Sequence, residues 1–198
     1  TFLLAAAIGI YLCIACGWEL LPLGLFGLLL IYTYTRYINR LPLLCLLAPG
    51  LGFGTVMVMG TDFVLAGSYN WTGFFAALTP FFLVSNLLLL NQFPDIPADQ
   101  KIGRMNYPII AGKRISALIY TIFMALTYVS IVLGVALNIL PAWALLGLGS
   151  MLIAVPTVRG VVRFANDEVG KLIPFMGMNV VVTLLTPVLV GIGLLIGG

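Results

Sequence analysis

The chain alternates long apolar runs with short polar connections, and the apolar runs have the length of membrane-crossing helices. A helix needs about 20 apolar residues to cross a hydrocarbon core about 30 Å thick, and most of the runs are near that length. The predicted spans are residues 2–16, 20–36, 42–61, 72–93, 114–138, 140–158 and 172–197. Backbone groups in lipid must be paired within a segment, and the period-two pattern of barrel strands is absent. The pattern therefore predicts an all-α, polytopic transmembrane helical bundle with seven spans, forming a single domain over residues 1–198.

Composition supports a lipid environment. Of the 198 residues, 62% are hydrophobic and 8% are charged, whereas charged residues make up about a quarter of soluble domains. Polar residues are too scarce to cover a soluble protein of this size, so the lipid bilayer is an expected partner. The modest net charge of +3 says little about partners, and nucleic acid is not an expected partner. The absence of histidine excludes Ser-His-Asp and Cys-His catalytic sites.

The interior of the predicted spans contains many glycines but almost no ionisable residue. Gly50 and Gly54, like Gly193 and Gly197, have the G-x-x-x-G spacing that lets two helices approach closely. Spans that carry an ion or proton path contain buried charges. Their scarcity here counts against a proton-coupled transporter.

The charged residues predict the orientation of the spans. If the spans alternate in direction, the connections after the second, fourth and sixth lie on one side of the membrane. All nine basic residues belong to these connections or to the helix ends beside them, namely Arg36, Arg40, Lys101, Arg104, Lys113, Arg114, Arg159, Arg163 and Lys171. The opposite connections contain Glu19 and Asp62. By the positive-inside rule, the basic side is predicted to be cytoplasmic.

One polar stretch, residues 91–104, combines acidic and basic side chains. Asn91, Asp95 and Asp99 are spaced i, i+4, i+8, which would align them along one side of a helix. Pro94 and Pro97 each remove a backbone donor, so we expect a helix end followed by a short irregular or helical piece rather than a regular helix. In either case two carboxylates and an amide oxygen point into one region at the membrane surface.

These oxygen ligands, without His or Cys, suit Mg²⁺, which is commonly shared between one or two carboxylates and substrate phosphates. Lys101 and Arg104 follow directly and could complete a phosphate site. On spacing alone, a solvated loop whose charges only fix the topology is the simpler interpretation.

A second polar cluster, residues 32–40, ends the second predicted span. Interfacial tyrosines and a snorkelling arginine are ordinary membrane anchors. The functional alternative places the Tyr32 ring beside a developing cation while Arg36 holds an anionic leaving group. A third cluster, residues 159–171, has no spacing that indicates chemistry and is interpreted as a topology-setting loop.

The stretch 91–104, NQFPDIPADQKIGR, resembles the second aspartate-rich motif of the UbiA superfamily of intramembrane prenyltransferases. It is similar to the N-x-x-x-D-x-x-x-D-x-x-x-G-[KR] form of the branch that prenylates 1,4-dihydroxy-2-naphthoate in menaquinone synthesis. Tyr32-x-x-x-Arg36 resembles the family's Tyr-x-x-x-Lys motif and stands the expected two spans earlier. The arginine is a departure that keeps the charge and changes its geometry.

The resemblance implies nine transmembrane helices around a central cavity, with aspartate-rich motifs after the second and the sixth. The seven predicted spans would then be family helices three to nine. Because Thr1 leads directly into an apolar run, we expect the first two helices and the first aspartate-rich motif to lie upstream in a longer protein, together with half of the magnesium site. The resemblance also implies a multi-pass protein of a bacterial inner (plasma) membrane, with the active site on the cytoplasmic side.

The activity implied by the resemblance is prenyl transfer. An isoprenyl diphosphate is bound through Mg²⁺, its C–O bond ionises, and an aromatic acceptor attacks the allylic carbocation. By this analogy Asp95 and Asp99 are metal ligands assisted by Asn91, and Tyr32 faces the carbocation. The residues implied to neutralise the diphosphate are Lys101, Arg104 and Arg36.

The sequence leaves other acceptors and other functions open. Related branches use 4-hydroxybenzoate, chlorophyllide, haem or glycerol-phosphate lipids as acceptors, and the acceptor depends on cavity residues that the sequence does not locate. A non-catalytic transporter or channel would have polar residues lining the span centres, which we do not find in the sequence. In a structural membrane subunit the Asp95 and Asp99 spacing would be incidental.

Overall fold

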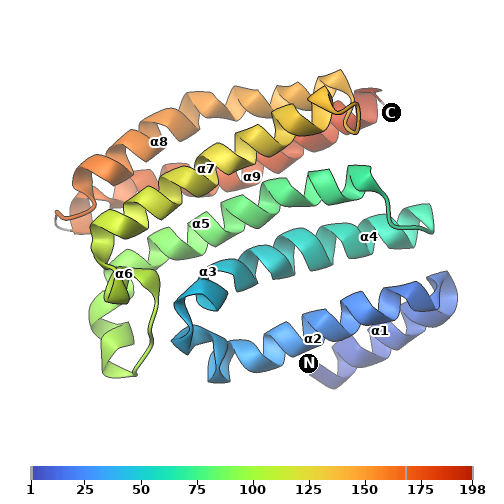
Figure 1. Ribbon diagram of the computed structural model, residues 1–198, viewed down its shortest axis with the longest axis horizontal. Helices are drawn as coiled ribbons and strands as arrows, with labels where there is room; N and C mark the ends of the chain where they lie inside the picture. The colour runs from blue at the N-terminus through green and yellow to red at the C-terminus, as the bar shows by residue number, and fades with distance from the viewer. Residues whose placement is uncertain (1, 168, 198) are drawn as a thin grey trace.

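The computed structural model describes residues 2–167 and 169–197, and regular structure in these ranges is entirely helical (Figure 1). The helices are α1 (Phe2–Cys16), α2 (Leu21–Arg36), α3 (Pro42–Gly50), α4 (Met57–Ala66), α5 (Trp71–Lys101), α6 (Tyr107–Ile110), α7 (Gly112–Ala136), α8 (Met151–Phe164) and α9 (Ile173–Gly197). A π-helical segment, η3 (Leu51–Val56), joins α3 to α4, and a 3₁₀ segment, η4 (Ala142–Ser150), precedes α8. Short 3₁₀ turns are η1 (Trp18–Leu20), η2 (Ile38–Arg40) and η5 (Val169–Lys171).

Five helical segments within the described residues are long and apolar enough to cross a membrane: Pro42–Ala66, Trp71–Lys101, Gly112–Ala136, Ala142–Phe164 and Ile173–Gly197. The first two predicted spans correspond to shorter apolar helices, Phe2–Cys16 and Trp18–Tyr34. The predicted all-α bundle is therefore confirmed. The fourth and sixth predicted spans are too short, because their helices continue into polar sequence at the basic end.

Helix α5 is the centre of the bundle (Figure 1). It packs against α7 and α9 on one side and against α3 and η3 on the other, while α1 and α2 form the outer edge. The main hydrophobic core contains large side chains that are fully enclosed, among them Leu83, Leu89 and Phe93 of α5 and Tyr120 of α7. This packing fixes the direction of α5 and therefore the position of the polar residues in its last turns.

The glycine pairs mark close contacts between helical segments. A Cβ atom at Gly54 would lie 2.6 Å from the backbone nitrogen of Phe81, and one at Gly50 would also meet the Phe81 backbone. At the other pair, a Cβ at Gly193 would collide with the Trp143 carbonyl, and one at Gly197 would lie 2.5 Å from Pro141. Both G-x-x-x-G pairs therefore permit the close helix approach that their spacing predicted.

The expected interruption of α5 at Pro94 and Pro97 is wrong, because the helix continues to Lys101. Each proline removes one backbone donor. Two prolines three residues apart lie on the same side of a helix, so their effect adds up to a bend rather than a break. Figure 1 shows the last turns of α5 bending away from the rest of the helix.

The statement that polar residues do not line the span centres is also wrong for uncharged side chains. Asn86 of α5, Tyr120 of α7 and Asn179 of α9 are completely buried between their helices. The Asn86 amide donates to the Tyr120 carbonyl at 2.9 Å, and the Tyr120 hydroxyl donates to Asn179 Oδ1 at 2.8 Å. Because the group is enclosed and bonded across helices, it holds the bundle together rather than lining a water path.

Candidate functional site

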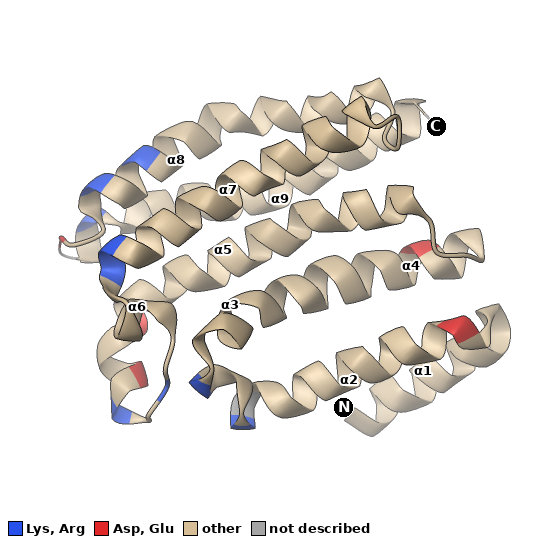
Figure 2. Ribbon diagram, in the orientation of Figure 1, with Lys and Arg blue, Asp and Glu red and all other residues tan. Residues whose placement is uncertain are grey.

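Charge is divided between the two ends of the bundle (Figure 2). Lys and Arg segments gather where α2, α5 and α8 end and where α7 begins. The acidic segments of η1 and α4, which contain Glu19 and Asp62, lie toward the opposite end. The predicted collection of basic residues on one face is confirmed, and the last turns of α5 belong to this basic end.

A pocket of about 50 Å³ lies beside these last turns. We call it the Asp95–Asp99 pocket. It is lined by Tyr34, Asn39, Cys45, Leu88, Asn91, Gln92, Asp95, Asp99, Arg104 and Asn106. These residues come from α2, η2, α3, α5 and the connection to α6, so the pocket depends on how the helix ends and the chain returns.

The end of α5 is a Schellman turn at Gly103. The Gly103 N–H donates to the Gln100 carbonyl at 3.2 Å, and the Arg104 N–H donates to the Asp99 carbonyl at 3.0 Å. Gly103 has φ 74°, a left-handed conformation that suits glycine at this position. The turn brings Arg104 back beside Asp99. The N–H of Met105 then donates to the Asn39 carbonyl at 3.1 Å, which ties the connection to η2.

The Asp99 carboxylate is buried and bonded through both oxygens. Its Oδ1 accepts from Arg104 Nη1 at 3.0 Å, and its Oδ2 accepts from Asn106 Nδ2 at 2.8 Å. Asp99 is 4% exposed and Asn106 is 1% exposed. Asn106 is also the N-cap of α6, because its Oδ1 accepts from the Ile109 N–H at 3.2 Å. A single asparagine therefore joins the start of α6 to Asp99.

Asp95 differs from Asp99 in being exposed. It lines the pocket one helical turn after Asn91, and it has no hydrogen bond or ion pair with any residue that the structure describes. Arg104 has a side chain that is 41% exposed, and its Nε is buried without a hydrogen-bond partner among the described residues. The pocket thus combines an exposed carboxylate with a guanidinium that is only partly engaged by Asp99.

The pocket offers oxygen donors of the kind that magnesium prefers. Among residues 2–167 and 169–197, no group of three or more His, Cys, Asp or Glu residues could hold a metal ion. Two carboxylates and the Asn91 amide suit a hard cation that completes its shell with water and phosphate oxygens. Asp99 uses two of the roughly four lone-pair positions of a carboxylate, which leaves acceptor capacity. The volume of about 50 Å³ suits a cation with a few waters, since each water needs about 10–15 Å³.

Three predicted site residues do not line this pocket. Tyr32 is 62% exposed. Arg36 is exposed, with its guanidinium 5.7 Å from the Tyr37 ring centre. Lys101, the last residue of α5, is exposed as well. The structure brings together Asn91, Asp95, Asp99 and Arg104.

Sequence reasoning missed several lining residues, of which Tyr34 and Asn106 are the most informative. Tyr34 follows Tyr32 by two positions, about 200° around a helix, so it faces the opposite way. No sequence signal distinguished the two rings. Asn106 had a recognisable signal, because an asparagine two residues before Pro108 is typical of a helix start.

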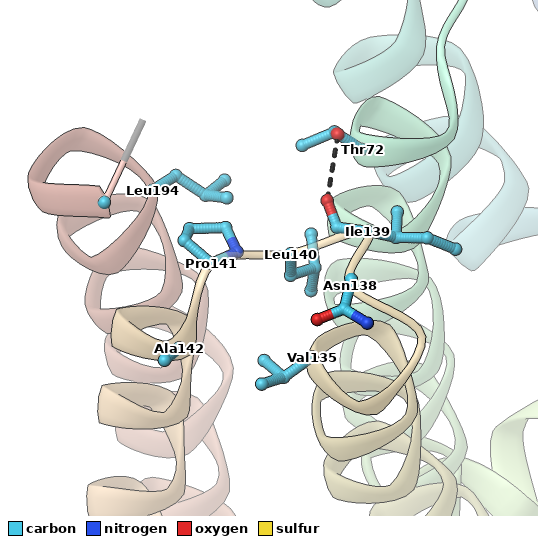
Figure 3. A pocket seen from close by; sticks show the side chains of 9 residues that line it. Thr72, Val135, Asn138, Ile139, Leu140, Pro141, Ala142 and Leu194 are labelled. Atoms are coloured by element: carbon cyan, nitrogen blue, oxygen red, sulfur yellow. Dashed lines mark hydrogen bonds between the residues drawn. The ribbon is translucent and has the colours of Figure 1, made fainter.

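A larger pocket of about 560 Å³ lies at the opposite end of the bundle (Figure 3). We call it the distal pocket. Figure 3 shows it between the connection from α7 to η4 and the facing ends of α5 and α9, with the Thr72 hydroxyl donating to the Ile139 carbonyl at 3.1 Å. Its lining contains no ionisable side chain. It therefore offers no charged side chain to a metal ion or a diphosphate.

Comparison with known proteins gives independent information. A model of the UbiA prenyltransferase family matches residues 1–195. The chain is 26% identical over 197 residues to a 1,4-dihydroxy-2-naphthoate octaprenyltransferase of Bacillus subtilis (strain 168), covering 98% of this chain and 62% of that protein. It is 28% identical over 109 residues to a Mycobacterium leprae (strain TN) protein of the same description, covering 55% and 36%. The chain thus spans less than two thirds of these relatives. No solved structure matches it significantly.

Proposed function

Because the chain belongs to the UbiA prenyltransferase family, we propose that it acts in magnesium-dependent transfer of a polyprenyl group from an isoprenyl diphosphate to an aromatic acceptor within the membrane. The observation that supports this most directly is the pairing of an exposed Asp95 carboxylate with the Arg104 side chain, which is 41% exposed, around one pocket. A metal ion and a diphosphate need these two kinds of group together.

In this proposal Asp95 and Asp99 hold Mg²⁺, and the Asn91 amide oxygen assists them. When bound, the metal supplies positive charge that stabilises the departing diphosphate. Arg104 binds the diphosphate through donors that Asp99 does not use. The pocket is small, so the diphosphate lies across its mouth rather than inside it.

Lys101 and Arg36 have a more distant role in the proposal. Both are exposed at the basic end, where they raise the positive potential that attracts and retains an anionic group. Tyr32 remains the proposed aromatic partner of the allylic carbocation, and Tyr34 is the alternative because it already lines the pocket. The surrounding lipid and apolar helices exclude the water that would quench the carbocation.

We propose 1,4-dihydroxy-2-naphthoate as the acceptor, in menaquinone synthesis, because both matched relatives are described by that substrate. Acceptors of related branches, such as 4-hydroxybenzoate, chlorophyllide, haem or a glycerol-phosphate lipid, are the alternatives. We further propose that residues 1–198 belong to one transmembrane domain. Its basic end would face the cytoplasm at a bacterial inner membrane, in accord with the positive-inside rule.

The central experiment compares Asp95→Ala with Asp62→Ala in the full-length protein. Both changes remove one carboxylate, but Asp62 lies in α4 outside the Asp95–Asp99 pocket. Transfer of labelled polyprenyl diphosphate would be measured against a panel of aromatic acids, with membrane insertion checked by fractionation. We expect Asp95→Ala to abolish magnesium-dependent transfer and Asp62→Ala to retain it.

Two results would contradict the proposal at different levels. Undiminished transfer by Asp95→Ala would remove the assigned metal site while leaving the activity. No transfer by the unmodified protein to any acceptor in the panel, with magnesium present, would count against the activity itself.

A further inference from the structure

We infer that Asn106 is a positioning residue, which fixes the Asp99 carboxylate so that its remaining lone pairs face the metal position. This inference rests on the proposed function, because it concerns the same pocket. Asn106 lies outside the stretch 91–104 and has no role in the activity described above. Its side chain is almost fully buried and makes two hydrogen bonds, one as a donor and one as an acceptor.

The chemistry of asparagine explains why this residue can make both bonds. Its Oδ1 accepts from the Ile109 N–H, and its Nδ2 donates to Asp99 Oδ2. Serine and threonine are also good N-caps, but a hydroxyl used to cap the helix lies on a shorter side chain and offers no amide donor to Asp99. Aspartate would cap the helix and present another negative charge to Asp99. Among common capping residues, only asparagine supplies an acceptor and an amide donor together.

The bond to Asn106 restricts how the Asp99 carboxylate can rotate. Arg104 Nη1 holds Oδ1 from one side, and Asn106 Nδ2 holds Oδ2 from the other. Without Asn106 the Asp99 carboxylate would be held at Oδ1 only, by Arg104, whose side chain is partly exposed. Hydrogen-bonded partners of metal-ligating groups commonly change metal affinity by about 10–100-fold when they are lost.

The chain contains a matched control for the simpler interpretation, that Asn106 is only a helix cap. Asn70 caps α5 in the same way, because its Oδ1 accepts from the Gly73 N–H at 2.7 Å. Its Nδ2 also donates to a carboxylate, Asp62 Oδ2, at 2.7 Å. The two asparagines therefore make the same pair of bonds, and Asn70 does so without contributing to the Asp95–Asp99 pocket.

The experiment compares Asn106→Ser with Asn70→Ser in the full-length protein. Serine preserves the cap and removes the amide donor in both cases. The first readout is the midpoint of thermal unfolding in detergent, without metal and then with Mg²⁺ and inorganic pyrophosphate. The second is the magnesium concentration that gives half-maximal transfer, measured separately from the maximal rate.

We expect both variants to lower the metal-free midpoint by similar amounts. Only Asn106→Ser should then need about 10–100-fold more magnesium for half-maximal transfer and for the pyrophosphate-dependent rise in midpoint. Asn106→Thr, which fills more of the buried volume, should reproduce this shift if the serine variant is recovered in low yield.

Equal magnesium requirements in the unmodified protein, Asn106→Ser and Asn70→Ser would overturn the inference and leave the proposed function intact. If the unmodified protein shows neither a magnesium-dependent rise in midpoint nor transfer, the proposed function fails, and the inference fails with it. The behaviour of the unmodified protein therefore separates the two failures.

Discussion

At each end of the bundle, an asparagine that caps a helix also donates a hydrogen bond to an aspartate, but the surroundings of the two aspartates differ. At the basic end Asn106 caps α6 and binds Asp99, and at the opposite end Asn70 caps α5 and binds Asp62. The distances are similar and both aspartates are shielded to some degree. Of these two aspartates, only Asp99 has a basic partner among the described residues, since Arg104 Nη1 reaches its Oδ1 at 3.0 Å.

An aspartate held by a capping asparagine is therefore not by itself a functional feature. Asp62 with Asn70 connects α4 to the start of α5, whereas the Lys and Arg segments in Figure 2 lie at the other end. Asp99 with Asn106 makes a similar connection, but beside Arg104, Asp95 and a pocket. The neighbouring groups, rather than the carboxylate, distinguish a candidate site from a structural contact.

The largest expected difference between the ends comes from Asp99→Asn and Asp62→Asn. Both oxygens of Asp99 accept, so an asparagine there must turn its NH₂ toward another donor. We expect the free energy of unfolding to fall by about 1–3 kcal/mol. Transfer should fall by more than about 100-fold, because loss of a residue that only hydrogen-bonds to a metal ligand already costs up to that much. At position 62 an asparagine can turn its oxygen toward Asn70, so denaturant unfolding and transfer should both stay close to normal. Equal effects at the two positions would contradict the comparison.

The second prediction tests whether the Arg104 guanidinium distinguishes the basic end from the opposite end. Arg104→Lys keeps a positive charge that can pair with Asp99, but it removes the planar fork and the Nε donor. We expect kcat/KM for the diphosphate donor to fall about tenfold, which corresponds to about 1.4 kcal/mol, with little change in unfolding midpoint. Transfer equal to that of the unmodified protein would mean that charge alone matters at this position.

The sequence predicted the helical fold well because lipid leaves few alternatives for an apolar chain. Long apolar runs must be helices, and the segregated basic residues identified which ends lie together. The predicted helix end at Pro94 and Pro97 was wrong. Prolines in a sequence do not reveal whether packing against neighbouring helices keeps a bent helix continuous. The prediction also failed for Asn86 and Asn179, since polar residues within an apolar run show neither their burial nor their partners.

The candidate site was predictable only where its residues lie along one helix. Spacing along α5 aligned Asn91, Asp95 and Asp99 correctly, and the pocket contains all three. The preference for Tyr32 over Tyr34 came from a motif and not from a contact, and only the packing of α2 shows which ring lines the pocket. The bond between Asn106 and Asp99 depends on the turn at Gly103, whose path the sequence alone did not describe.

The third prediction uses the glycines that end α4 and α5. Gly67 and Gly103 both have φ 74°, and both have open space where a Cβ would be. Alanine in this left-handed conformation should cost about 1–2 kcal/mol, so both variants should lose similar stability in denaturant titrations. Gly103→Ala should also raise the magnesium requirement several-fold, because its turn places Arg104 beside Asp99. A similar rise for Gly67→Ala would show that general loosening of the bundle, and not the turn, sets the requirement.

The smallest expected effect is that of Lys101→Gln. Lys101 ends α5 beside the pocket but does not line it, and its ammonium group is exposed to solvent. An exposed charge of this kind contributes less than about 1 kcal/mol and is screened over about 8 Å at physiological ionic strength. We therefore expect kcat/KM for the diphosphate donor to fall less than about fivefold at low salt, with the difference disappearing at high salt. The loss in Arg104→Lys should persist under both conditions, because the charge is kept and the loss comes from the missing fork geometry. A salt-resistant loss in Lys101→Gln as large as that of Arg104→Lys would place the diphosphate over the outer face of the α5 terminus, and the pocket would then bind the metal alone.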